Sequence, residues 1–217
     1  MNNKEKVPGN THNFEHIFAL LKQKYPDAAP ALHFSSPLEL LIATILSAQC
    51  TDKQVNQVTQ SLFKKYRSLE DFAGADVSEF GQEIYSTGFY NQKAKHIIES
   101  AQIMLSDFGG QVPNTMEDLL QLPGVGRKTA NIVLSRAFGK IEGIAVDTHV
   151  KRLSNRLGFT QNEEPEKIEK DLMRIAKRED LETLSMTLIL HGRNVCIARN
   201  PKCVECVVKE LCPSSRV

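Results

Sequence analysis

The stretch Leu122-Pro-Gly-Val-Gly-Arg-Lys-Thr-Ala130 decides the fold of this chain of 217 residues. It joins two predicted helices, at 115–122 and 127–138, through two glycines one residue apart. Glycine has no Cβ, so such a turn can be tight and its backbone can approach a ligand closely. The N–H groups that open the second helix then point outward and suit a phosphate. An ordinary turn explains a lone Gly-x-Gly equally well, but the complete string between two helices favours an anion site.

Helical periodicity extends over the rest of the chain and predicts an all-α fold. Apolar residues recur at helical spacing between Gly and Pro breakers, and no segment sustains the two-residue alternation of a strand. Ser36 is expected to cap a helix whose first residue is Pro37. The short connections suit a compact helical array. The predicted helices span residues 13–24, 37–48, 52–65, 76–84, 91–106, 115–122, 127–138, 148–157, 165–177 and 181–191.

Length and composition indicate a soluble globular protein. The chain has room for one domain or two small ones, and 41% hydrophobic with 24% charged residues excludes a fibrous or largely disordered chain. The longest apolar stretch, residues 38–48, is shorter than the roughly 18 residues that a membrane span needs. The first ten residues lack the apolar core of a secretory signal. We therefore expect a cytoplasmic protein with no membrane partner.

Charge is distributed unevenly along the chain. The net charge of +1 argues against a globally basic nucleic-acid binder. However, residues 121–160 carry a net +5 and residues 191–217 a net +3, whereas residues 1–120 carry −4 and residues 161–190 carry −3. The two basic segments fit a polyanion bound at one face, and they fit two solvated faces equally well.

Four of the five cysteines cluster near the C-terminus, at Cys196, Cys203, Cys206 and Cys212. In a cytosolic chain such clustering indicates a metal site rather than disulfides. Four thiolates at these spacings can bind zinc or a cubane iron–sulfur cluster. Structural zinc sites usually pair two close Cys-x-x-Cys units and this segment has one, so the spacing favours iron–sulfur modestly.

Five strings together resemble the base-excision DNA glycosylases that contain a helix-hairpin-helix. They are the hairpin string 122–130, Ala145-Val-Asp-Thr-His149, the cysteine spacing, Ser47-Ala-Gln-Cys-Thr-Asp52 and Gly88-Phe-Tyr-Asn91. The resemblance runs from about residue 34 to 212 and is close to the bacterial endonuclease III family. That family removes oxidised pyrimidines from DNA and then nicks the strand.

The resemblance implies a two-lobed helix-hairpin-helix glycosylase fold with the DNA cleft between the lobes. Residues 30–141 would form a six-helix barrel, with the hairpin at about 115–138. Residues 1–29 and 142–217 would form the lobe that holds a [4Fe-4S] cluster on the four clustered cysteines. The implied partner is double-stranded DNA with a damaged pyrimidine or an abasic site, bound by a monomer at the bacterial nucleoid.

The resemblance assigns catalysis to Lys128 and Asp147. Lys128 would attack the sugar C1′ and form a Schiff base, and β-elimination would then break the strand on the 3′ side. A lysine on a helix is usually a surface charge, but here the helix dipole and Arg127 both favour the neutral amine that a nucleophile needs. Asp147 is expected to cap the helix that begins at Thr148. Its fixed carboxylate could stabilise positive charge on the sugar or take a proton from the attacking amine, and both roles stay open.

The remaining assignments concern DNA binding. In the family, the residue at Gln49 fills the gap left by the extruded base, and the residue at Phe89, after Gly88, displaces the partner base. The hairpin backbone of Gly124, Val125, Gly126 and Arg127 would hold a phosphate. Arg199 and Lys202 would contact further phosphates or merely keep the segment soluble, and His149 would pack locally or reach a phosphate.

Two residues depart from the family pattern, and two other functions remain open. Thr87 stands where relatives usually have an aliphatic residue, and Cys50 replaces a small residue. A monofunctional mismatch glycosylase is the first alternative, although such relatives lack a lysine at position 128. A non-catalytic DNA-binding or redox-sensing iron–sulfur protein is the second, although it would need neither Lys128 nor Asp147.

Overall fold

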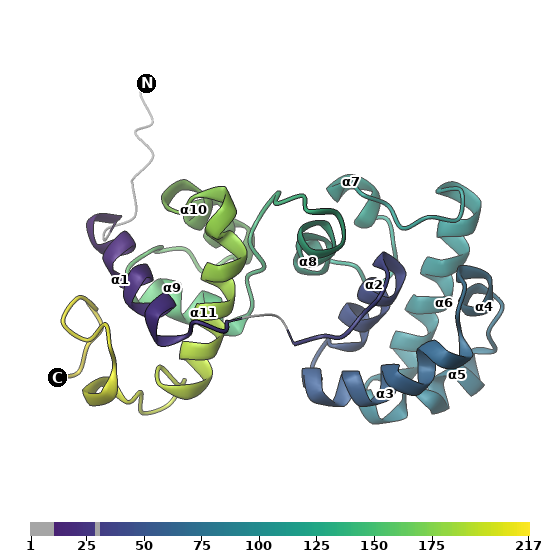
Figure 1. Cartoon of the computed structure of the whole chain (residues 1–217), viewed down its shortest axis with the longest axis horizontal. Coiled ribbons are helices and arrows are strands. Elements are labelled where there is room, and N and C mark those ends of the chain that lie inside the picture. The colour runs from purple at the N-terminus through teal and green to yellow at the C-terminus, as the bar shows by residue number, and fades with distance from the viewer. Residues whose placement is uncertain (1–10, 29–30) are drawn as a thin grey trace, which may run out of the picture. The chain divides into compact units, whose positions relative to one another are not determined.

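The structure is a computed structural model that describes residues 11–28 and 31–217 (Figure 1). Within this described part every regular element is a helix and no β-strand is present, which confirms the all-α prediction. The chain divides into two compact units. One unit is Ala31–Glu142, and the other combines residues 11–28 with Gly143–Val217. No helix of the described residues has both the length and the apolar character that crossing a membrane requires.

The unit Ala31–Glu142 is built around two helices, α6 and α2. The helix α6 packs against α4 and α5, and α2 packs against α8, α3 and α6. The helices of this unit are α2 (Pro37–Leu46), α3 (Asp52–Lys65), α4 (Leu69–Ala73), α5 (Val77–Glu83), the 3-10 helix η1 (Tyr85–Thr87), α6 (Tyr90–Asp107), α7 (Met116–Leu119) and α8 (Arg127–Phe138).

The central position of α2 follows from its sequence. All seven residues from Leu40 to Leu46 are buried, as expected for a helix that is apolar on every side. Ser36 caps it as predicted, because its side chain accepts a hydrogen bond from the Glu39 N–H, and Pro37 is its first residue. The helix ends at Leu46 rather than at the predicted residue 48, because the chain turns at Gln49 with a positive φ of 54°.

One α-helix of this unit, α4, was not predicted. The five residues of α4 are too few to produce a periodic apolar pattern. The helix is instead defined by a capping box, in which Ser68 Oγ accepts from the Asp71 N–H and the Asp71 carboxylate accepts from the Ser68 N–H. It buries Leu69 and Phe72.

The second unit is organised by α11. The helix α11 packs against α9 and α1, and α9 also contacts α10. The predicted apolar face of the first helix is buried through Phe14, Ile17, Phe18 and Leu21. The helices of this unit are α1 (Thr11–Lys24), α9 (Thr148–Arg156), α10 (Pro165–Ile175), the 3-10 helix η2 (Arg178–Asp180), α11 (Leu181–Asn194) and the 3-10 helix η3 (Cys203–Glu205).

Candidate active site and metal centre

The turn between α7 and α8 is shaped by packing on α6. Gly124 has a φ of 77°, and a Cβ at this position would lie 2.8 Å from His96 Nδ1. The Ser100 hydroxyl donates to the Pro123 carbonyl at 2.9 Å, and Val125 is buried. Gly124 is therefore required twice, for its left-handed backbone and for its close approach to α6.

The start of α8 differs from the turn that precedes it. Gly126 is the N-cap residue, with a φ of −95°, and it has no side chain with which to cap the helix. A Cβ at Gly126 would meet no atom within 4 Å. The first N–H groups of a helix have no partner within the helix, so this end suits an anion. Lys128 lies in the first turn, and its side chain is exposed.

Asp147 caps α9, as predicted. Its Oδ1 accepts hydrogen bonds from the His149 and Val150 N–H groups, both at 2.8 Å. Because Oδ1 makes both bonds, the cap does not require Oδ2. The carboxylate is thus held in one orientation by the backbone. Asp147 belongs to the unit that begins at Gly143, whereas Lys128 belongs to the unit that ends at Glu142.

His149 is held by its own unit. Its Nδ1 lies 3.1 Å from Arg152 Nη2, and Arg152 also donates to the Gly192 carbonyl at 2.9 Å. Burial lowers the pKa of His149, while Asp147 acts in the opposite direction. This environment gives His149 a local packing role, and its contact with a phosphate stays a prediction.

Gln49 and Phe89 lie in two exposed turns of the unit 31–142. Both are non-glycine residues with positive φ, 54° for Gln49 and 50° for Phe89. The Phe89 side chain is 66% exposed, although it is large and apolar. Backbone strain of this kind in an exposed turn is often associated with function.

Thr87 and Cys50, the two residues expected to depart from the family pattern, occupy different environments. Thr87 is buried, and its hydroxyl donates to the Ile84 carbonyl at 2.8 Å, so its side chain faces the interior of the unit. Cys50 is half-buried and packs against the core of the same unit, away in sequence from the clustered cysteines.

The four clustered cysteines line one cavity. Its walls also include Leu153, Leu157, Val195 and Val208, so the thiols lie in an apolar surrounding. Burial raises the pKa of the Cys206 and Cys212 thiols, so a bound metal must displace their protons. No group of three His, Cys, Asp or Glu side chains in the described part of the chain is arranged around a single ion.

Donors around this cavity fit a thiolate-ligated cluster. Arg156 Nη1 donates to Cys196 Sγ at 3.3 Å, and His191 Nε2 lies 3.4 Å from Cys206 Sγ. Burial lowers the pKa of His191 to about 4, so its ring is neutral at pH 7. Ser215 also lines the cavity, and its buried Oγ has no hydrogen-bond partner. Such donors to sulfur are typical of iron–sulfur sites.

Arg199 and Lys202 flank a strained residue in the loop between the first two cysteines. Both side chains are exposed, and Asn200 between them has a φ of 52°. The loop is fastened by the Lys202 N–H, which donates to the Val195 carbonyl at 3.0 Å. The two cations thus extend from a loop with a defined backbone.

The contacts of three side chains were not predicted from the sequence. Arg156 and His191 contact cysteines that lie 40 and 15 residues away in the chain, and Lys93 donates to the Leu46 carbonyl, 47 residues away, and to the nearby Thr87 carbonyl. The conspicuous sign in the sequence was only that a lysine occupies an apolar helix face. The partners of Lys93 are main-chain carbonyls, which every residue has, so the sequence does not identify them.

Comparisons with known proteins agree with this geometry. Residues 42–178 match the HhH-GPD superfamily of base excision DNA repair proteins, and residues 196–212 match the iron–sulfur binding domain of endonuclease III. Endonuclease III of Synechocystis sp. is 48% identical over 97% of this chain and 96% of its own length. Endonuclease III of Bacillus subtilis is 44% identical over 94% of this chain and 93% of its own length.

A solved structure has the same fold. It is a trapped covalent intermediate of endonuclease III with DNA. Its protein chain is 41% identical to this chain, and the match covers 94% of this chain and 96% of that chain with a TM-score of 0.89. These matches confirm the predicted helix-hairpin-helix glycosylase fold and the [4Fe-4S] cofactor.

Proposed function

Because this chain belongs to the HhH-GPD superfamily of base excision DNA repair proteins, we propose that it is a bifunctional DNA glycosylase and abasic-site lyase. Its substrate would be double-stranded DNA with an oxidised pyrimidine or an abasic site, bound by a monomer at the bacterial nucleoid. The observation that carries this proposal is Lys128, an exposed amine in the first turn of α8, directly after a glycine turn that suits a phosphate.

Binding would begin at the phosphates. The N–H groups from Gly124 to Arg127 would hold a phosphate next to the damaged nucleotide. Arg199 and Lys202 would add contacts that position the duplex without reading its bases. The cluster, held by Cys196, Cys203, Cys206 and Cys212, would supply the cross-link that fixes this loop.

The damaged base must leave the stack before it can be cut. Gln49 would fill the gap, and Phe89 would displace the partner base. The exposure of Phe89 leaves its ring free to stack on the apolar face of a base, which supports this role.

Bond cleavage would follow from Lys128 and Asp147. A bond forms between Lys128 Nζ and C1′ while the glycosidic bond breaks, and the base leaves with that electron pair and takes up a proton. The fixed Asp147 carboxylate would stabilise the positive charge that develops on the sugar. The nitrogen would then lose a proton and form a double bond to C1′ while the C1′–O4′ bond breaks, so that the sugar ring opens, O4′ takes up a proton and a protonated imine results. Loss of a C2′ proton expels the 3′ phosphate, and water releases the lysine.

Lys128→Gln tests the nucleophile. The variant keeps side-chain length and polarity but cannot form an imine, so borohydride trapping on abasic duplex DNA should be lost. Binding of the same DNA should be retained, because the backbone makes the phosphate site. Lys95→Gln is the matched control, since Lys95 is another exposed lysine of the same unit. Trapping retained by Lys128→Gln would assign the nucleophile to another amine.

Asp147→Asn tests the carboxylate, and Asp76→Asn is an unusually close control. Asp76 Oδ1 accepts from the Ser78 and Glu79 N–H groups, both at 2.9 Å, so it caps α5 as Asp147 caps α9. Both variants should destabilise the protein equally, by about 1 kcal/mol or less. Base excision should fall by roughly two orders of magnitude or more for Asp147→Asn alone. An equal loss in the two variants would reduce Asp147 to a helix cap.

A further inference from the structure

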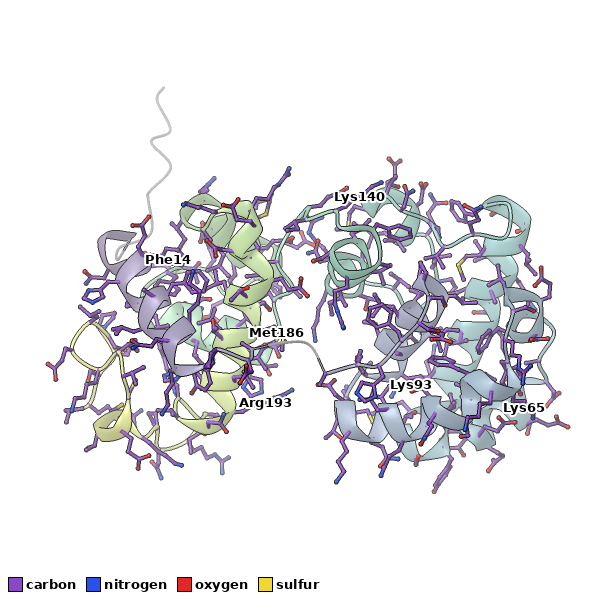
Figure 2. The ribbon with its side chains drawn as sticks, in the orientation of Figure 1. Phe14, Lys65, Lys93, Lys140, Met186 and Arg193 are labelled. Carbon is purple, nitrogen blue, oxygen red and sulfur yellow. The ribbon has the colours of Figure 1, made fainter. Side chains whose placement is uncertain are left out.

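Lys93, on α6, is a buried cation with main-chain partners. Its side chain lies within the unit 31–142, as Figure 2 shows, and only 4% of the residue is exposed. Its Nζ donates to the Leu46 carbonyl and to the Thr87 carbonyl, both at 2.8 Å. Removing a lysine ammonium from water is costly unless its hydrogen bonds are replaced, so these two bonds are essential to its placement.

The two carbonyls belong to the two turns that present Gln49 and Phe89. Leu46 is the last residue of α2, three residues before Gln49. Thr87 ends η1, two residues before Phe89. Both exposed residues have strained left-handed backbones, so each turn needs neighbouring groups that hold it in place.

Other contacts fasten one turn at a time. Gln54 Nε2 donates to Ser86 Oγ at 2.8 Å, and the Thr87 hydroxyl donates to Ile84 within the same turn. Lys93 differs because a single ammonium contacts both turns. Burial lowers the pKa of Lys93, and the charge of the Cys50 thiol acts in the opposite direction.

We propose that Lys93 is a positioning residue that couples the Gln49 turn to the Phe89 turn, so that both side chains enter the DNA together. The proposal rests on the DNA-probing roles given above to Gln49 and Phe89. Without the ammonium, each turn loses a bond to its backbone at the same time. Binding to undamaged DNA does not depend on this coupling, because it uses the phosphate contacts of the hairpin and the cluster loop.

Lys93→Met tests the proposal, because methionine keeps an unbranched buried side chain without donors. The probe is a duplex with a stable abasic-site analogue and 2-aminopurine in the opposite position, whose fluorescence rises when it unstacks. We expect the rise at saturation to be reduced severalfold, and kcat on a damaged base to fall about tenfold or more because the nucleotide is misplaced. The inhibition constant of undamaged competitor DNA should not change. Lys95→Met on the same helix is the control.

Two comparisons separate the possible failures. If Gln49→Ala and Phe89→Ala leave the fluorescence rise unchanged, the probing roles are wrong whatever Lys93 does. If both reduce it but Lys93→Met does not, with the melting temperature and cluster spectrum of the parent, the positioning role is overturned.

A second measurement avoids substitution of the buried lysine. In protein that retains Lys93, coupled turns predict that Gln49→Ala and Phe89→Ala are non-additive, with the double variant losing less than the product of the single losses. Strictly multiplicative losses would overturn the coupling, even if Lys93→Met failed to fold.

Discussion

The hairpin of α7 and α8 and the cysteine loop at 196–212 are held together in opposite ways. The hairpin is shaped by apolar packing, since Leu119, Leu122 and Val125 are buried. In the cysteine loop Val208 is buried, but Val204 is 72% and Val207 40% exposed. The hairpin therefore has a hydrophobic core beneath it, whereas the loop depends on its four thiols.

Because of this difference, a substitution should separate function from structure in the hairpin but not in the cysteine loop. Lys128 contributes an exposed side chain to a hairpin that other residues hold, so under the proposed function its substitution should remove catalysis without loss of structure. In the cysteine loop the proposed cluster ligands would also be the groups that cross-link the loop. A lost ligand there should change structure and DNA binding together.

Cys203→Ser should have the largest effect and would sharpen this contrast. The protein should lose the visible absorption of the cluster and most of its roughly four irons per chain, together with DNA affinity. Cys50→Ser is the control, because Cys50 packs in the other unit and lines no part of the cysteine cavity. Iron content and binding to abasic DNA check both variants. A Cys203→Ser protein with parental DNA affinity would show that the loop keeps its shape without the cluster.

The two hairpin glycines provide a smaller test within one turn. Gly124→Ala requires a strained φ and moves a methyl against His96, so we expect a loss of about 2–3 kcal/mol in the free energy of unfolding. Gly126→Ala has room and an ordinary φ, and should cost at most about 1 kcal/mol. It should nevertheless weaken DNA binding, because the methyl lies where the backbone meets the phosphate. Equal stability losses would contradict the packing account of the hairpin.

Local signals in the sequence predicted the helices that begin or end at strong caps. The bounds of α3 and α8 agree to the residue, and Thr51 caps the start of α3 while a glycine lies at each end of α8. The α4 helix was not predicted, because its capping box lies outside any long apolar period. For the candidate site, the sequence predicted the placement of Lys128 at the start of α8 and the grouping of the four cysteines, and the chemical roles of these residues stay predictions.

Hydrogen bonds from a side chain to a distant main-chain carbonyl were not predictable. Lys93 reaches a carbonyl 47 residues away, and the sequence of Leu46 carries no sign of that contact. The same holds for Arg156, whose carbonyl partners at Ile197 and Ala198 lie beyond α11. Such contacts depend on the packing of helices, which periodicity alone does not specify.

The smallest expected effect is a change in the salt dependence of DNA binding, which distinguishes phosphate contacts made by side chains from those made by the backbone. Salt dependence of DNA binding arises when cations neutralise phosphates and release counterions, and each lost contact reduces the log–log slope by roughly one. Replacing both Arg199 and Lys202 with alanine should therefore flatten the slope by roughly two and weaken binding at low salt. Gly126→Ala should weaken binding with an unchanged slope, because a backbone N–H carries no net charge.

The control replaces Lys177 and Arg178, two exposed cations of the same unit as the cysteine loop, and should leave the slope as in the parent. Titrations at several salt concentrations distinguish these cases, and an unchanged slope without Arg199 and Lys202 would mean that the cysteine loop faces solvent rather than DNA.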